Sequence, residues 1–341
     1  MGVIFAEDLE AWRRWQRGRH ALRRLRSLAR PAEPLTMVLH QRGDEPRALF
    51  ALDATTPTAL ASVLEPLAHL GDLPVAIVAP GDLSARLPGG WTTERIPATE
   101  VPPALRGVAA VVSAGHFLPV GQATHHWARA LGARYVVVQH GLLTPFAPPL
   151  APNAHLLAFS AADAEFWRAG RSDVTSERIG SQLLWQAAQN PHPHGDVAAA
   201  PTFLGQLHGA ELARRISAAT ATSFCREQGA IYRPHPAETD RLSRWQHARW
   251  QRRGIRFAAP GSLSSSDGPV VSIFSTGVLE AAAAGRDAWV TCVRPPAWVR
   301  EFWQRYELAE WGGRPTARPR QPAREPAAAI ADTLSEIVGG R

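Results

Sequence analysis

VVSIFSTGVLEAAAAG, residues 270–285, decides the fold of this chain. An apolar run leads into a short turn of small polar residues, and an alanine-rich segment then continues to a glycine. The pattern predicts a buried strand, a tight turn and a helix. Ser275 is placed to cap that helix, so the backbone N–H groups of its first turn would face outward, where they attract anions.

The same turn therefore indicates a phosphate site. We expect Ser275, Thr276 and Gly277 to bind a phosphate group. Glu280 comes one helical turn later and could reach the hydroxyls of a ribose. An ordinary strand-to-helix turn with a serine cap has the same pattern, and that interpretation stays open.

Short apolar runs of the same kind recur along the whole chain. They lack strict alternation, as parallel strands covered by helices on both faces do, and helical segments separate them. We therefore predict an α/β fold in two similar halves joined by a proline-rich linker. The expected segments are a basic N-terminal helix at residues 1–31, a first domain at 32–189, a linker at 190–196 and a second domain at 197–341.

The composition narrows the classes of protein. Apolar residues make up 45% of the 341 residues, enough for a core in each half, and two cysteines exclude a disulfide-stapled scaffold. So few cysteines also lead us to expect a protein of the reducing cytoplasm, and no apolar run of about 18 residues supports a transmembrane helix. All 37 basic residues are arginine and the net charge is +7, which favours anionic partners.

Residues 7–30 predict a basic helix that carries tryptophan and ends before Pro31. Such a helix can lie in an anionic membrane surface. It can also pack on the domain and leave an arginine face in solvent. The sequence favours neither interpretation.

A second polar segment, YRPHPAE at residues 232–238, directly follows a predicted strand. Open α/β sheets bind their ligands at the carboxyl ends of their strands. The prolines on both sides of His235 restrict its backbone, and its imidazole can bind phosphate when protonated or transfer protons when neutral. Arg233 adds a planar group of donors that suits phosphate.

A histidine also follows a strand in the first half, in the sequence Gln139-His140-Gly141. We expect these residues at the carboxyl edge of the first domain, lining a cleft. Gly205 and Gln206 follow the first strand of the second half and are expected to line the same cleft. The alternative for His140 is a histidine that only satisfies a turn carbonyl.

Three of these elements, in this order, resemble a known group of enzymes. Gln139-His140-Gly141, Arg233-Pro234-His235-Pro236 and Ser275-Thr276 look like motifs of the GT-B-fold transferases of bacterial surface polymers. This group includes teichoic-acid glycerophosphotransferases, polysialyltransferases and capsule glycosyltransferases. The resemblance implies two Rossmann-like domains that face each other across a cleft, with the acceptor on the side of the first domain and the donor in the second.

The resemblance also implies a chemistry. The donor would be a cytidine nucleotide, bound without an obligatory metal or other cofactor, and the acceptor would be a polymer or a lipid-linked molecule. The donor phosphate would contact Arg233, His235, Ser275 and Thr276. A leaving nucleoside phosphate develops negative charge, which these groups can stabilise. The enzyme would work in the cytoplasm or as a peripheral protein on the inner face of the membrane.

The resemblance places His140 and His235 among the catalytic residues but does not identify the base that takes the acceptor proton. Glu238, which ends the second polar segment, is a candidate for that catalytic role. His140 and the pair Asp44-Glu45 are further candidates.

Two other functions compete with a transferase. Nucleotide-sugar 2-epimerases hold a sugar nucleotide between similar domains, but they need several carboxylates at the reacting centre, and few are evident here. A basic protein without catalytic activity could bind nucleotides or nucleic acid through its N-terminal helix. Because the arginines are spread along the chain and no known nucleic-acid module is present, we do not expect nucleic acid as a partner.

Overall fold

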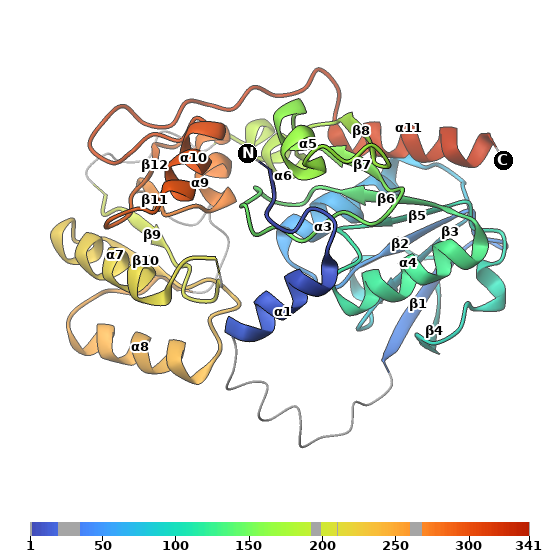
Figure 1. Cartoon of the computed structure of the whole chain (residues 1–341), viewed down its shortest axis with the longest axis horizontal. Coiled ribbons are helices and arrows are strands. Elements are labelled where there is room, and N and C mark those ends of the chain that lie inside the picture. The colour runs from blue at the N-terminus through green and yellow to red at the C-terminus, as the bar shows by residue number, and fades with distance from the viewer. Residues whose placement is uncertain (1, 20–34, 192–198, 210, 260–267, 341) are drawn as a thin grey trace. The chain divides into compact units, whose positions relative to one another are not determined.

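The computed structural model describes residues 2–19, 35–191, 199–209, 211–259 and 268–340 (Figure 1). The chain has an α/β fold, as the sequence predicts. It divides into two compact units. The first unit consists of Met1–Leu183 and Pro322–Arg341, and the second of Leu184–Gln321.

Within the described residues, the first unit contains an eight-stranded mixed sheet in the order β4-β1-β3-β2-β5-β6-β7-β8. Strands β2, β3, β5, β6, β7 and β8 are parallel, and β1 is antiparallel to both of its neighbours. The strands are β1 (Thr36–Arg42), β2 (Ala48–Ala51), β3 (Val75–Ala79), β4 (Thr92–Pro97), β5 (Ala110–Ser113), β6 (Arg134–Val138), β7 (His155–Ala158) and β8 (Thr175–Arg178).

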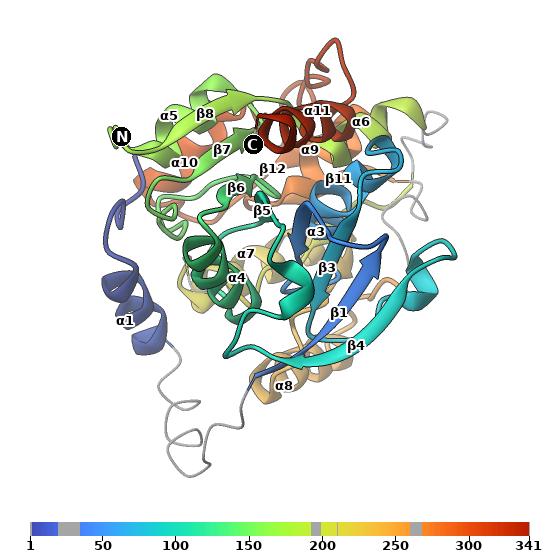
Figure 2. The same cartoon turned by 90° about the vertical axis from the view of Figure 1, so that its right-hand side faces the viewer.

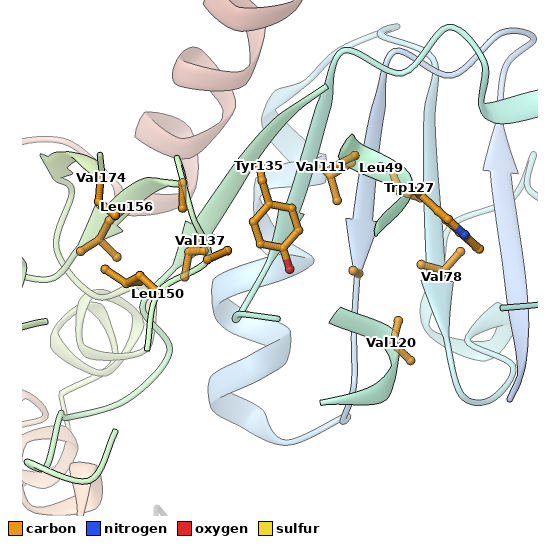
Figure 3. Packing of buried hydrophobic residues seen from close by; sticks show 14 of the residues in the cluster. Leu49, Val78, Val111, Val120, Trp127, Tyr135, Val137, Leu150, Leu156 and Val174 are labelled. Carbon is orange, nitrogen blue, oxygen red and sulfur yellow. The ribbon is translucent and has the colours of Figure 1, made fainter. Parts of the chain in front are cut away.

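Helices cover both faces of this sheet (Figure 2). They are α3 (Pro57–Val63), α4 (Pro119–Leu131), α5 (Ala161–Arg168) and α11 (Pro326–Gly339). The unit also contains α1 (Leu9–Arg19), and α6 (Gln182–Gln189) crosses the boundary between the units. Short 3-10 helices are η1 (Glu65–His69), η2 (Ser84–Arg86) and η3 (Pro103–Leu105). Figure 3 shows the core on one face, where Trp127 of α4 is fully buried in the same cluster as Leu49 and Val111.

The last helix differs from the sequence expectation. Residues 197–341 were expected to form one domain, but α11 belongs to the first unit. Its apolar positions Ile330 and Leu334 are one helical turn apart, so they share a face. Both side chains are buried in the first unit's second core cluster, which also contains Phe50 and Ile77 from the sheet.

Within the described residues, the second unit contains a parallel four-stranded sheet in the order β10-β9-β11-β12. Its strands are β9 (Thr202–Leu204), β10 (Ile231–Arg233), β11 (Val270–Ser272) and β12 (Ala288–Val290). Its helices are α7 (Arg214–Glu227), α8 (Arg241–Arg252), α9 (Thr276–Ala283) and α10 (Ala297–Arg305). The decisive stretch 270–285 thus forms β11, a turn and α9, which confirms the predicted strand, turn and helix.

Two predicted segments lie partly outside the described residues. Of the linker at 190–196, the structure describes only Asn190 and Pro191. Of the basic helix at 7–30, it describes residues 7–19, where α1 begins at Leu9. Trp12 of that helix is buried and donates its indole N–H to the carbonyl of Phe146. In the described part of the chain no helix has the length and apolar character needed to cross a membrane.

Candidate functional site

The candidate site lies in the second unit, at the carboxyl ends of β9, β10 and β11. The chain passes from β9 to β10 on one side and later returns to β11 on the other side, so the connections diverge at β9. Open α/β sheets bind ligands at such a point. Register brings the strand ends together, because Leu204 of β9 pairs with Arg233 of β10, and Phe203 pairs with Val271 of β11.

The loop after β11 presents the predicted phosphate turn. Ser275 has an extended backbone and caps α9, and its hydroxyl accepts a hydrogen bond from the N–H of Gly277 at 3.1 Å. Thr276 and Gly277 are half-buried and form the first turn of the helix. This geometry is the serine cap that the sequence predicts. An anion at this turn would meet the positive end of the helix dipole.

Gln206 supports this turn from the loop after β9. Its side-chain oxygen accepts hydrogen bonds from the backbone N–H of Phe274 at 3.0 Å and from the hydroxyl of Ser272 at 3.2 Å. The residue was expected to line a binding site, and the structure places its side chain against the residues that lead into the predicted phosphate turn. Gln206 therefore fixes the loop after β9 to the end of β11.

The loop after β10 is anchored by Glu238. Its buried carboxylate accepts hydrogen bonds from the N–H of Leu207 at 2.9 Å, the hydroxyl of Tyr232 at 2.8 Å and Nε2 of His247 at 2.8 Å. Burial acts to raise the pKa of this carboxyl, but the hydrogen bonds from His247, Leu207 and Tyr232 outweigh it and lower the pKa. With these partners Glu238 anchors the loop after β10 to the loop after β9, and its expected role as a catalytic base stays a prediction.

Gly205 is required by the same contacts. A Cβ atom at this position would lie 2.3 Å from the hydroxyl oxygen of Tyr232 and 2.7 Å from a carboxylate oxygen of Glu238. These distances are far below van der Waals contact, so no side chain fits. Gly205 lets the loops after β9 and β10 approach each other.

His235 lies against a histidine that the sequence did not assign a role. The rings of His208 and His235 are stacked, with centroids 3.8 Å apart and planes 16° from parallel. Nδ1 of His235 accepts a hydrogen bond from the N–H of Ala237 at 3.1 Å, which leaves Nε2 for another partner. Nδ1 of His208 is buried and makes no hydrogen bond within the described part of the chain.

Both imidazoles favour the neutral state. Burial, together with the neighbouring His235, lowers the pKa of His208 to about 4. Burial also lowers the pKa of His235, although Glu238 acts in the opposite direction. Protonation of one ring is unfavourable in this buried pair, and protonation of both is more unfavourable still, because the two positive charges repel each other. A bound anion would compensate these charges. The sequence feature that could have indicated a role for His208 is the loop Gly205–Gly209, in which this histidine follows a strand.

Arg233 and Glu280 complete the group. Burial raises the pKa of Glu280, while the positive charges of Arg233 and Arg286 act to lower it. The guanidinium of Arg233, at the end of β10, therefore lies within electrostatic range of the carboxyl of Glu280 on α9. The structure thus collects the predicted residues Arg233, His235, Ser275 and Glu280 at one edge of one sheet.

The remaining predicted residues belong to the first unit, at the end of β6. Gln139 is buried; its amide donates to the carbonyl of Gly141 at 2.9 Å and accepts from the N–H of Phe159 at 2.8 Å. It therefore holds the loop, with Gly141 as its partner. His140 is half-buried, burial lowers its pKa, and its ring makes no hydrogen bond to any described residue. A neutral imidazole of this kind can accept a proton.

The first unit has its own point of divergence, between β2 and β5, but there the helix N-terminus is filled. The carboxylate of Asp53 accepts the N–H groups of Val120 and Gly121, at 2.7 and 2.9 Å, at the start of α4. Burial raises the pKa of Asp53, and these two hydrogen bonds partly offset the effect. The protein's own carboxylate thus occupies the position at which a phosphate would bind. No pattern in the sequence indicates this contact.

The loop after β5 carries another histidine of the first unit, His116. Its side chain is buried, Nδ1 makes no hydrogen bond within the described residues, and burial with neighbouring positive groups lowers its pKa to about 4. Its ring lies 5.1 Å from that of His125. Asp44 and Glu45, the other base candidates, are exposed in the turn after β1.

A comparison with models of protein families and a comparison with curated proteins each gave no match to this chain.

Proposed function

We propose that this chain is a transferase that takes its donor from a nucleotide, and that the second unit binds the phosphates of that donor. The observation that carries the proposal is the convergence of the capped N-terminus of α9, the stacked histidines and Arg233 at the carboxyl edge of β9, β10 and β11. All these groups donate hydrogen bonds or carry positive charge when an anion is present. Nucleotide phosphates are the anions that α/β sheets bind at such an edge.

The contrast between the two units supports a donor site in the second. The α4 N-terminus of the first unit is filled by Asp53, whereas Ser275 caps α9 with a neutral hydroxyl. A neutral cap leaves the positive end of the helix dipole uncompensated. The second unit is therefore the better place for phosphate.

We further propose that the two units are the Rossmann-like domains of a GT-B enzyme that face each other across a cleft. The support is the resemblance of the motifs around His140, Arg233-Pro234-His235-Pro236 and Ser275-Thr276 to surface-polymer transferases. On the same ground the donor is a cytidine nucleotide and the acceptor a polymer or lipid-linked molecule.

In the proposed reaction, an acceptor hydroxyl loses its proton to His140 and its oxygen bonds to the transferred group. The bond between that group and the nucleoside phosphate breaks, and the electron pair leaves with the phosphate. Protonated His235, Arg233 and the N–H groups of α9 stabilise the new negative charge. His140 takes the role of base because Glu238 is fully engaged by hydrogen bonds.

Thermal unfolding with CMP, CDP, UDP and GDP tests the proposal. We expect a cytidine nucleotide to raise the melting temperature by mass action, and the variant His235→Ala to lose most of that increase. His126→Ala, an exposed histidine of the first unit, is the matched control and should keep it. If no nucleotide changes the melting temperature of the wild type at millimolar concentration, the proposal is wrong.

A further inference from the structure

Helix α8 presents an unusual surface. Between Arg241 and Arg252 it contains four arginines and no acidic residue. Trp250 is its inward anchor, because it is buried against Tyr232 with ring centroids 4.8 Å apart. Leu242 and Trp245 of the same helix are 54% and 51% exposed. Large apolar side chains that are exposed together among arginines are typical of a binding surface.

A groove runs beside this surface. Helices α7 and α8 lie side by side in the second unit (Figure 1), and between them is a cavity of about 610 Å³. Its α7 wall is made of small residues and its rim of arginines, and the lining includes Ala218, Ala219, Thr222, Ser223, Arg226, Arg249 and Arg253. Glu227 also lines the groove, where its carboxylate accepts a hydrogen bond from the hydroxyl of Ser223.

The arginines of the rim lack anionic partners. Arg226 and Arg253 make no side-chain hydrogen bond or ion pair with the part of the chain that the structure describes. The guanidinium of Arg249 lies over the ring of Trp245, 5.4 Å from its centroid. Three positive charges thus gather around a groove with one carboxylate, next to two exposed apolar side chains. This distribution is complementary to a negatively charged surface that also has an apolar layer.

We propose that this α7–α8 surface, defined by Arg226, Arg249, Arg253, Leu242 and Trp245, binds the surface of an anionic lipid bilayer. The arginines contact headgroup phosphates, and the apolar side chains enter the boundary between headgroups and acyl chains. A basic helix with outward leucine and tryptophan binds membranes in this way.

Two observations favour a bilayer over nucleic acid. Leu242 has no ring on which a base could stack, yet it is as exposed as Trp245. One face of the Trp245 ring is already covered by Arg249, which reduces the surface available for base stacking. Lipid contact uses both side chains, whereas a nucleic acid would leave Leu242 without a partner.

The N-terminal helix is the less suitable membrane surface in its described part. Trp12 of α1 is buried, with its indole N–H bonded to the carbonyl of Phe146, and Trp15 stacks on the ring of Phe146 with centroids 4.9 Å apart. The tryptophans that suggested membrane binding at residues 7–30 therefore serve packing. The exposed tryptophan of α8 takes that role.

Co-sedimentation of the full chain with lipid vesicles tests the proposal. The wild type should bind vesicles of phosphatidylcholine mixed with phosphatidylglycerol, and not vesicles of phosphatidylcholine alone. Arg226→Gln combined with Arg249→Gln and Arg253→Gln should lower the partition coefficient on the order of 100-fold at low salt. Leu242→Ser combined with Trp245→Ser should also weaken binding. The difference between this variant and the wild type should persist when salt is added, because salt screens charges but not apolar contacts.

A matched control separates this surface from net charge. Arg14→Gln, Arg17→Gln and Arg86→Gln remove the same charge from exposed positions of the first unit and should leave vesicle binding unchanged. An equal loss in this control would overturn the proposal, and so would unchanged binding by both α8 variants. Absence of wild-type binding would do the same.

Two further measurements test the folding of the variants and the binding of nucleic acid. The melting temperature of each variant confirms that it is folded; the exposed positions predict little change. Titration with single-stranded RNA provides the competing outcome. The proposal fails if the wild type binds RNA, the arginine variant binds RNA more weakly, and vesicle binding is the same for both proteins. The surface would then recognise nucleic acid.

Discussion

At the scale of single residues, the second unit is organised around a contact among three side chains. Tyr232 and His247 donate to the buried carboxylate of Glu238, and Gly205 leaves room for them. Each partner occupies a lone pair that would otherwise be buried without a hydrogen bond. The contact holds the loops after β9 and β10 in position, so it places His208 and His235.

Glu238→Gln should destabilise the second unit. The substitution replaces one accepting oxygen by an NH2 group, which faces either Leu207 or Tyr232 and His247. All three are donors, so we expect a loss of about 1–3 kcal/mol in the free energy of unfolding. Urea denaturation followed by circular dichroism measures it. Glu301→Gln, at an exposed position of the same unit, is the control and should change stability little.

The same substitution should alter the dependence of stability on pH. Because the folded-state pKa of Glu238 is lowered, its contribution is present above the unfolded pKa of about 4.3 and is lost as the pH falls through the folded pKa. The wild type should therefore lose more stability between about pH 6 and pH 3 than Glu238→Gln does. Parallel curves for the two proteins would contradict the structural role.

The stacked histidines predict that nucleotide binding takes up a proton. His208 and His235 have lowered pKa values in the free protein, and a bound phosphate favours the imidazolium form. Affinity for CMP should therefore increase as the pH falls, as measured by calorimetry in buffers of different protonation enthalpy. Because the phosphate itself titrates near about pH 6, the comparison with His235→Asn isolates the protein's share. His126→Asn should behave as the wild type.

The sequence could predict some of these residues and not others. Ser275 was identifiable as a cap because capping depends on neighbours along the chain. The role of Glu238 was not, because its partners Leu207 and His247 come from other elements. The stacking of His208 on His235 was not predictable either, because the two residues belong to different loops. Polar residues after a strand predict where a site is; they do not predict which side chains remain available in it.

At the scale of elements, buried strands such as β2, β3 and β5 followed their apolar runs, since a strand buried on both faces has a distinctive composition. The largely exposed strands β4 and β8 have no such run and were not predicted. The membership of a helix is harder to predict. An apolar face such as that of α11 shows that the helix packs, but not on which core. Here Ile330 and Leu334 pack in the first unit, across the predicted domain boundary.

Leu334→Ala should therefore destabilise the first unit. Removing this fully buried side chain should cost about 2–5 kcal/mol. In hydrogen exchange, the amides of β2 and β3 should lose protection. Those of β9 should keep theirs, because β9 belongs to the second unit. Glu336→Ala, an exposed position of the same helix, is the control. Loss of protection confined to β9 and β11 would show that α11 supports the second unit.

At the scale of the whole molecule, the two units give different environments to similar strand ends. In the first unit, Asp53 closes the N-terminus of α4; in the second, the N-terminus of α9 carries a neutral cap. This difference decides where a phosphate is expected. No pattern in the sequence indicated it, because Asp53 and α4 are far apart along the chain.

Addition of CMP should consequently protect the second unit selectively. We expect slower hydrogen exchange in the segments 205–209, 234–238 and 273–277, which surround the proposed phosphate site. The first turn of α4 should exchange at the same rate with and without nucleotide. Protection of α4 alone would move the phosphate site to the first unit.

The placement of α11 also determines the order in which a ribosome can complete the two units. Residues 184–321 leave the exit tunnel before α11 does, so the second unit can fold while the first still lacks Ile330 and Leu334. During that interval, the part of the sheet that α11 later covers is exposed. That apolar surface therefore stays accessible to chaperones until α11 packs on it.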